Sequence, residues 1–241
     1  MMNTVLFDLD GTLLPMDMGL FTGIYFRELG EFFSDLLDPG EMINFVLTAT
    51  VEMINNIEDR SNEEVFTERF GRLIEGKGEL QDFVQRFDKF YETVFMKTKD
   101  AVIETPVMRE SVKILREKGY HLVIATNPIF PLKGILHRIR WAGLEPSDFL
   151  YISYFEKSHY CKPQLKFYEE VLRDLGKNPD ECLMVGNDVQ EDVIAGELGI
   201  ETYLVTNQLL HRTGEEIKAN HVGTYDDFYT FVQGLPEADR V

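Results

Sequence analysis

Apolar residues follow a helical spacing over about residues 17–100 of the chain. Four stripes repeat at three- and four-residue intervals, over about 21–32, 43–54, 65–74 and 80–95. Of the chain's 18 phenylalanines, 11 lie in this segment, which is enough apolar material for four helices to form a core of their own. We therefore predict an inserted all-helical domain over 17–100.

The flanking parts, residues 1–16 and 101–241, show a second pattern in which short apolar runs alternate with amphipathic stretches. The runs predict strands at about 4–9, 120–125, 149–153, 182–185 and 202–205. The amphipathic stretches predict helices at about 107–118, 132–142, 167–175, 190–198 and 225–232. Because strands and helices that alternate in this way form parallel sheets with right-handed crossovers, we predict an α/β fold with helices on both faces of the sheet.

The charge balance is strongly acidic, with 24 basic and 42 acidic residues and a net charge of −18. Such a charge repels nucleic acids and anionic lipid surfaces, so we expect neither as a partner. No apolar stretch reaches the roughly 20 residues of a membrane-spanning helix, and we find no export signal. Cys161 and Cys182 give no disulfide framework, so we expect a cytoplasmic protein. We also expect a monomer or weak homodimer.

Candidate chemistry follows four of the predicted strands. The four patterns are Asp8-Leu9-Asp10-Gly11-Thr12, Thr126-Asn127, Cys161-Lys162-Pro163 and Gly186-Asn187-Asp188-Val189-Gln190-Glu191-Asp192. We expect them to converge at the carboxyl edge of the sheet, where parallel α/β folds bind their ligands. On an extended strand Asp8 and Asp10 point to the same side, and Pro163 can start a helix directly after Lys162.

Each pattern alone has an ordinary structural explanation. A pair of acids two apart can cap a strand-end turn, and a Thr-Asn pair is common in turns. A Lys-Pro pair can begin a solvated helix, and acids four apart suit the positive end of a helix. The four patterns in this order, each at a strand-to-helix junction, favour one common site.

With these motifs the chain resembles the haloacid dehalogenase-like hydrolases, in particular members with a helical C1-type cap inserted after the first motif. The resemblance spans nearly the whole chain and implies a Rossmann-like core over 1–16 and 101–241, with a cap domain over 17–100. It also implies a magnesium-dependent phosphatase that hydrolyses a small phosphorylated metabolite through an aspartyl-phosphate intermediate.

The resemblance implies specific roles for three acids. Asp8 matches the nucleophile and Asp10 matches the general acid and base. Mg²⁺ is expected to bind the carboxylates of Asp8 and Asp188 and the backbone carbonyl of Asp10, which removes the repulsion between Asp8 and the phosphate. Because the dehalogenases and phosphonate-cleaving enzymes of the superfamily carry a different residue two after the nucleophile, Asp10 favours phosphate-ester chemistry.

The remaining motif residues match the groups that bind phosphate or support the site. Thr126, with Asn127 beside it, matches the hydroxyl that holds the phosphoryl oxygens, and Lys162 matches the neutralising cation. Asp192 is expected either to reach the metal through water or to support Lys162. Asn187 stands where a second acid could complete the metal shell, so the groups that complete this shell stay open.

The helical segment supplies a few candidate substrate contacts. Arg60 lies in a loop between the second and third predicted helices of this segment, and Lys97 and Lys99 lie where the chain returns to the core. Arg60 can either contact an anionic leaving group or be a solvated loop charge.

Two alternative functions stay open at this stage. A phosphosugar mutase, similar to β-phosphoglucomutase, uses the same nucleophile and a similar cap. A phospho-aspartate signalling module also combines acids, Thr and Lys on a parallel sheet. Such modules lack a helical insertion after the first strand, so the motif order disfavours them.

Overall fold

The computed structural model describes residues 2–238 and contains one parallel six-stranded sheet. The strands, in the sheet order β3-β2-β1-β4-β5-β6, are β3 (Tyr151–Ile152), β2 (His121–Ile124), β1 (Thr4–Phe7), β4 (Cys182–Gly186), β5 (Glu201–Val205) and β6 (His221–Gly223). Strand β1 lies at the centre, where Phe7 pairs with Ile124 of β2 and with Val185 of β4. The carboxyl ends of these three strands therefore lie side by side at one edge of the sheet.

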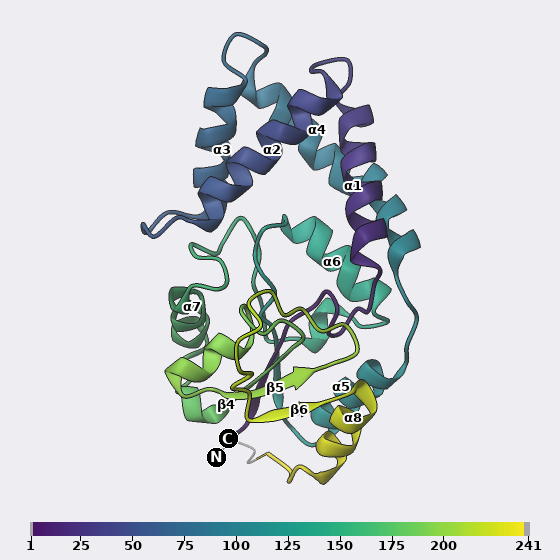
Figure 1. The fold of residues 1–241 in the computed structure, drawn as a ribbon, viewed down its shortest axis with the longest axis vertical. Coiled ribbons are helices and arrows are strands. Elements are labelled where there is room, and N and C mark those ends of the chain that lie inside the picture. The colour runs from purple at the N-terminus through teal and green to yellow at the C-terminus, as the bar shows by residue number, and fades with distance from the viewer. Residues whose placement is uncertain (1, 239–241) are drawn as a thin grey trace.

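Successive residues of β1 point to opposite faces of the sheet and all of them are buried, because helices cover both faces. Val5 and Phe7 pack in one apolar cluster with helices α5 (Val107–Glu117), α6 (Leu132–Trp141) and α8 (Tyr225–Gly234). Leu6 packs in a second cluster with α7 (Leu165–Leu175) and the 3₁₀ helix η4 (Val193–Leu198). The predicted α/β fold with two covered faces is confirmed (Figure 1).

Four α helices and a 3₁₀ helix occupy the segment between β1 and α5. They are α1 (Met18–Phe32), α2 (Pro39–Ile54), α3 (Asn62–Leu73), α4 (Leu80–Glu92) and η1 (Val94–Ala101). Their apolar stripes pack as an aromatic cluster, for example where Phe70 meets Phe83 with ring centroids 5.6 Å apart. Figure 1 places α1–α4 on one side of the molecule, away from β5 and β6 and beyond α6.

The helical segment leaves and rejoins the rest of the chain through two short stretches that run side by side. Met16 and Val102 form an antiparallel bridge, and the Asp17 N–H donates to the Ala101 carbonyl at 2.9 Å. The two connections therefore meet next to the loop that follows β1.

Several predicted elements need correction. Strand β6 was not predicted, because its three half-buried or exposed residues form no apolar run. The helix predicted at 190–198 is the shorter 3₁₀ helix η4, and the strand predicted at 149–153 is reduced to β3. Helix α7 begins at Leu165 after a cis Lys162–Pro163 peptide bond, so Pro163 does not start it.

Two further short 3₁₀ helices, η2 (Pro146–Asp148) and η3 (Pro179–Glu181), lead into β3 and β4. In the part of the chain that the structure describes, no helix has the length and apolar character needed to cross a membrane.

Candidate active site

The loop after β1 carries Asp8 and Asp10 through a tight turn. Strand β1 ends at Phe7, so the alternation of an extended strand does not extend to these two acids, and the expectation that rested on it does not hold. Gly11 has φ = +84°, and a Cβ at this position would lie 2.4 Å from Asn187 Nδ2. Glycine is therefore required here both by the left-handed backbone and by the close approach of the loop after β4.

Backbone donors are free in the same turn. The Gly11 N–H donates to the Leu14 carbonyl at 2.9 Å. Within residues 2–238, the N–H groups of Leu9 and Asp10 donate to no protein acceptor. Two adjacent free N–H groups next to Asp8 suit an anion such as a phosphoryl group.

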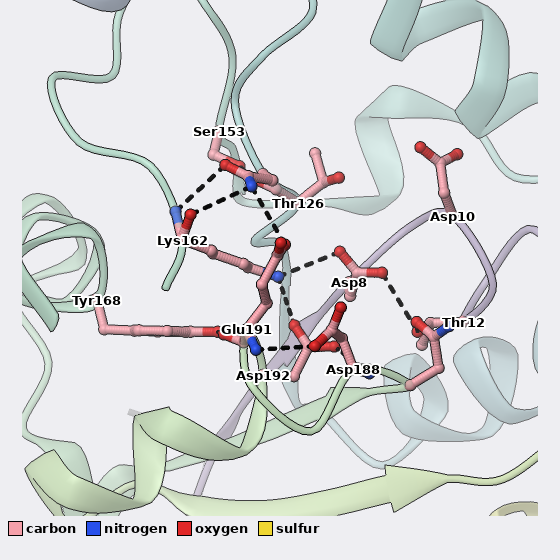
Figure 2. A network of polar contacts seen from close by, with 12 residues as sticks. Asp8, Asp10, Thr12, Thr126, Ser153, Lys162, Tyr168, Asp188, Glu191 and Asp192 are labelled. Carbon is pink, nitrogen blue, oxygen red and sulfur yellow. Dashed lines mark hydrogen bonds and ion pairs between the residues drawn. The ribbon is translucent and has the colours of Figure 1, made fainter. Parts of the chain in front are cut away.

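Lys162 connects the ends of two strands through its buried ammonium group. The side chain is fully buried, and Nζ lies 3.1 Å from Asp8 Oδ1 and 2.6 Å from Asp192 Oδ1 (Figure 2). Burial by itself would lower the pKa of Lys162, but the negative charges of Asp192 and Asp8 outweigh it and raise this pKa well above its usual value. Lys162 is therefore a fixed positive charge beside the Asp8 carboxylate.

The Asp192 side chain packs closely against Gly186 at the end of β4, and this contact is possible because glycine has no side chain. A Cβ on Gly186 would lie 2.1 Å from Asp192 Oδ2. This oxygen accepts the Asp188 N–H at 2.9 Å, while the other oxygen binds Lys162. Burial raises the pKa of Asp192 to about 7, although Lys162 pulls it down. Asp192 thus supports Lys162, which was one of its two expected roles.

Asp188 lies between two backbone donors and an arginine. Its Oδ1 accepts the N–H groups of Gln190 at 2.9 Å and Glu191 at 3.0 Å. Arg212, from the loop after β5, binds both carboxylate oxygens, at 2.9 Å for Oδ1 and 2.5 Å for Oδ2. Its guanidinium also lies 3.5 Å from Glu191. The Arg212 guanidinium therefore binds the Asp188 carboxylate, which was expected to bind the metal.

Asp10 is held separately from Asp8. Its Oδ2 forms an ion pair with Arg138 of α6, whose side chain is 1% exposed and lies 4.3 Å from the centroid of the Phe130 ring. Asp10 Oδ1 and Arg138 Nη2 are both buried without a hydrogen-bond partner in the described chain. Burial is the main cause that raises the pKa of Asp10; the nearby Asp8 adds to it and Arg138 opposes it.

Thr126 and Asn127 follow β2 and face the same cluster. Thr126 is buried and its carbonyl accepts the Ser153 hydroxyl at 2.6 Å, while its own hydroxyl forms no hydrogen bond within the described chain. Asn127 Oδ1 accepts the Lys162 N–H at 3.2 Å, and its Nδ2 lies 3.1 Å from Glu191 Oε2. Asn127 therefore positions the Lys162 backbone, and the Thr126 hydroxyl is free for a ligand.

Asn187 cross-links two loops. The Thr12 hydroxyl lies 3.1 Å from Asn187 Oδ1 and 3.4 Å from Asp8 Oδ2, and Asn187 Nδ2 donates to the Gln208 carbonyl at 2.6 Å. Both ends of the Asn187 amide are thus used within the protein, so this residue fits a structural role better than that of a metal ligand.

The candidate contacts from the helical segment lie outside this cluster. Arg60 pairs with Glu68 of α3 at 2.5 Å, and Lys97 pairs with Glu28 of α1 at 2.6 Å. Within residues 2–238, neither pairs with the acids after β1 or β4. Sequence reasoning missed Arg138 and Arg212. Arg138 lies on the apolar face of α6 together with Ile135 and Ile139, and an arginine within such a stripe was the available signal.

The carboxylates of this cluster are ligands of the kind that Mg²⁺ prefers. No three His, Cys, Asp or Glu side chains within residues 2–238 are arranged to hold a metal ion. Mg²⁺ does not require three, because it binds one or two carboxylates and fills its shell with carbonyls, waters and substrate phosphate. The cluster has five carboxylates, namely Asp8, Asp10, Asp188, Glu191 and Asp192, and three cations, namely Lys162, Arg138 and Arg212. The five carboxylates exceed the three cations by two, and this excess of negative charge fits a site that binds a cation.

Two known relatives are similar to this chain in sequence, at low identity. Pyrophosphatase PpaX of Bacillus pumilus is 24% identical over 196 residues, which cover 81% of this chain and 78% of that protein. A glyceraldehyde 3-phosphate phosphatase of Methanothermobacter thermautotrophicus is 30% identical over 107 residues, or 44% of this chain and 46% of that one.

Solved structures show the same fold at low identity. A HAD phosphatase from Thermococcus onnurineus superposes with a TM-score of 0.60 at 18% identity and covers 98% of this chain and 100% of its own. An L-2-haloacid dehalogenase from Xanthobacter autotrophicus does so with a TM-score of 0.59 at 15% identity, over 98% and 100% of the two chains. The fold alone is therefore common to phosphatases and dehalogenases. The family model of the haloacid dehalogenase-like hydrolases matches residues 2–198, and the chain belongs to this family.

Proposed function

We propose that the protein is a phosphatase that transfers the phosphoryl group of a small phosphorylated metabolite to Asp8 and then to water. The observation that carries this proposal is the buried Lys162, which binds Asp8 on one side and Asp192 on the other. A fixed cation beside a carboxylate can balance the charge of an incoming phosphate. The names of the two relatives, a pyrophosphatase and a glyceraldehyde 3-phosphate phosphatase, support the same reaction class.

The first step forms a bond between Asp8 and phosphorus and breaks the bond to the leaving oxygen. Lys162, the Thr126 hydroxyl and the free N–H groups of Leu9 and Asp10 would hold the transferring oxygens. Asp10 would give a proton to the leaving alcohol, and burial, which raises the pKa of Asp10, favours the protonated form that this role needs.

The second step returns Asp8 to its free form. Asp10, now ionised, takes a proton from a water molecule that attacks phosphorus, and the bond to Asp8 breaks with release of inorganic phosphate. Arg138 pairs with Asp10 Oδ2 and leaves the other oxygen of this carboxyl for proton transfer in both steps. Asp10 Oδ1, which has no partner within the described chain, is the oxygen available for the proton.

We propose Mg²⁺ as the cofactor, held by the carboxylates of Asp8 and Asp188 and the backbone carbonyl of Asp10. When bound, it supplies the positive charge that lets two anions approach each other. For Asp188 to bind the metal, Arg212 would have to leave the Asp188 carboxylate. The Arg212 side chain is 53% exposed, so water can hydrate its guanidinium group once the ion pair is broken.

We also propose that residues 17–100 act as a cap over the carboxyl edge of the sheet. The support is that the two connections to this segment meet at Met16 and Val102, directly after the loop that carries Asp8 and Asp10. A cap at this position would exclude water from the phosphoryl group during the first step.

A panel of sugar, nucleotide and short-acid phosphates, assayed for phosphate release with and without Mg²⁺, tests the proposal. We expect release that depends on Mg²⁺ and that is absent in Asp8→Asn. Release that is equal in Asp8→Asn would exclude Asp8 as the nucleophile. Slow, steady release together with conversion of one sugar phosphate into its isomer would favour the phosphosugar mutase.

A further inference from the structure

A partly enclosed cavity of about 150 Å³ lies between the helical segment and the core of the protein. Helices α1–α4 form one side of it, and the loops at 129–133 and 155–156 form the other. A cavity of about this size holds one benzene molecule, which corresponds to roughly six non-hydrogen atoms. It therefore has room for a compact organic group.

Six aromatic residues line the cavity. Phe66, Phe70 and Phe87 come from α3 and α4, and Phe155 comes from the core. Phe66 meets Phe155 with ring centroids 5.6 Å apart and meets Phe87 at 6.1 Å. The faces of such rings carry negative partial charge, which attracts cations.

Direct contacts between the two parts hold the wall in place. The Asn62 N–H donates to the Ser158 carbonyl at 2.8 Å, and Asn62 Nδ2 donates to the Pro128 carbonyl at 3.1 Å. The Glu63 N–H donates to the Phe155 carbonyl at 3.2 Å. The start of α3 is thus fixed to the loops that form the core side of the cavity.

The charges on the cavity lining are mainly negative. They comprise the carboxylates of Glu63, Asp88 and Glu156 and the single ammonium group of Lys133. Lys133 is already neutralised, because its Nζ lies 2.5 Å from both Asp88 and Glu92. Glu63 and Glu156 pair with no cation within residues 2–238, and burial followed by the nearby Glu156 charge raises the pKa of Glu63.

The loop after β2 contributes residues both to the cavity and to the phosphoryl site. Ile129, which lines it, donates its N–H to the Asn127 carbonyl at 2.8 Å. Tyr25, also in the lining, packs on Phe130 with ring centroids 5.7 Å apart. Phe130 stacks on Arg138, which binds Asp10. A chain of direct contacts thus links the cavity lining to Asp10, the proposed proton donor for the leaving group.

We propose that this cavity binds the leaving group of the substrate, and that this group is compact, apolar and positively charged, as in the phosphate ester of a small alkylammonium alcohol. The inference rests on the proposed phosphatase function. Glu63 and Glu156 would attract the ammonium, while the aromatic wall would contact its alkyl groups and its charge. An anionic leaving group, such as the second phosphate of pyrophosphate, would be repelled by the same acids.

A pair of matched esters tests the charge preference directly. Choline phosphate and 3,3-dimethylbutyl phosphate have the same shape, but only the first carries a positive charge on its leaving group. We expect kcat/KM to be about five- to thirtyfold higher for choline phosphate, which is the range of a cation on aromatic faces. Equal values, or a preference for the neutral ester or for pyrophosphate, would overturn the inference.

Glu63→Gln and Glu156→Gln test whether the cavity causes the preference for a positively charged leaving group. Each removes one charge, and Glu156→Gln keeps an oxygen that can accept the Leu132 N–H, which Glu156 binds at 3.0 Å. We expect each variant to reduce the ratio between the two esters at least about threefold, with little change for the neutral ester. Glu75→Gln is the matched control, since this exposed acid of the helical segment lies outside the lining.

Binding of choline itself separates this inference from the proposed function. A titration of the full chain with choline, followed by NMR, needs no turnover. Binding that weakens in Glu63→Gln and Glu156→Gln but not in Glu75→Gln would support the cavity site even if no phosphate ester were hydrolysed. Phosphate release from other esters without any choline binding would overturn the inference and leave the phosphatase intact.

Discussion

Replacing Lys162 by methionine separates the role of this side chain in folding from its role in chemistry. Methionine has a similar length but no charge. It would leave the buried Asp192 carboxylate, whose side chain is 3% exposed, without the ammonium group that lies 2.6 Å away. Removing one partner of a buried ion pair costs about 3–5 kcal/mol. We expect the free energy of unfolding to fall by about this amount at pH 8.

The loss depends on pH because Asp192 can take up a proton. Burial raises the pKa of Asp192 to about 7, and Lys162 is the main group that pulls it down, so in Lys162→Met the pKa rises further. The folded variant then binds this proton more tightly than the unfolded chain does, and its stability increases as the pH falls. Between pH 8 and pH 6 the variant should gain up to about 2.7 kcal/mol in stability. Wild-type Asp192, with a pKa of about 7, also takes up protons over this range, so the gain relative to the wild type is about 1.4 kcal/mol.

Urea unfolding at the two pH values measures these changes, with Lys162→Met/Asp192→Asn as the companion variant. The double variant has no buried unpaired charge, and its Asn can still accept the Asp188 N–H. We expect it to be more stable than the single variant at pH 8 by about 2 kcal/mol, yet to release no phosphate. A single variant that loses less than about 1 kcal/mol at pH 8, or that shows no pH dependence, would refute the reasoning.

Three further substitutions follow from the same contacts. Asp10→Asn should lower kcat about 10²- to 10⁴-fold for poor leaving groups and leave the protein folded but with a lower melting temperature, because the buried Arg138 loses its charged partner; turnover equal to wild type would refute its role as proton donor. Arg138→Met removes the group that lowers the pKa of Asp10, so the alkaline limb of the kcat profile should move to higher pH, and a profile that stays in place would contradict the ion pair. Gly186→Ala should cost about 1–3 kcal/mol and most of the activity, because its Cβ would collide with Asp192, whereas Gly234→Ala, which meets nothing within 4 Å, should change activity little.

The sequence was most informative where burial imposes a simple pattern. Strands β1, β2, β4 and β5 are nearly fully buried, so their continuous apolar runs were visible, and the stripes of α1–α4 followed the helical period. Strand β6 is an edge strand of three residues with exposed Val222, and its existence depends on pairing with β5. Such pairing is a tertiary effect that local composition does not encode.

The motifs identified the acids and the lysine, but not their partners. Support of Lys162 was one of the two roles that the resemblance to the family implied for Asp192. The contacts of Arg138 with Asp10 and of Arg212 with Asp188 join segments more than 20 residues apart. The apolar stripe around Arg138 indicates that this arginine is buried, but it does not indicate which acid it binds. Arg60 shows the converse, since a loop charge that was a candidate substrate contact is paired with Glu68.

The central claim is that Asp8 carries the phosphoryl group during turnover. The most direct measurement mixes the enzyme with Mg²⁺ and a hydrolysed ester, quenches the mixture in acid within the first turnover, and maps phosphorylation by peptide mass spectrometry. We expect one acid-stable acyl phosphate on the peptide that contains Asp8, and none in Asp8→Asn. Rapid phosphate release with no modified peptide, or with the phosphoryl group on another residue, would contradict the account.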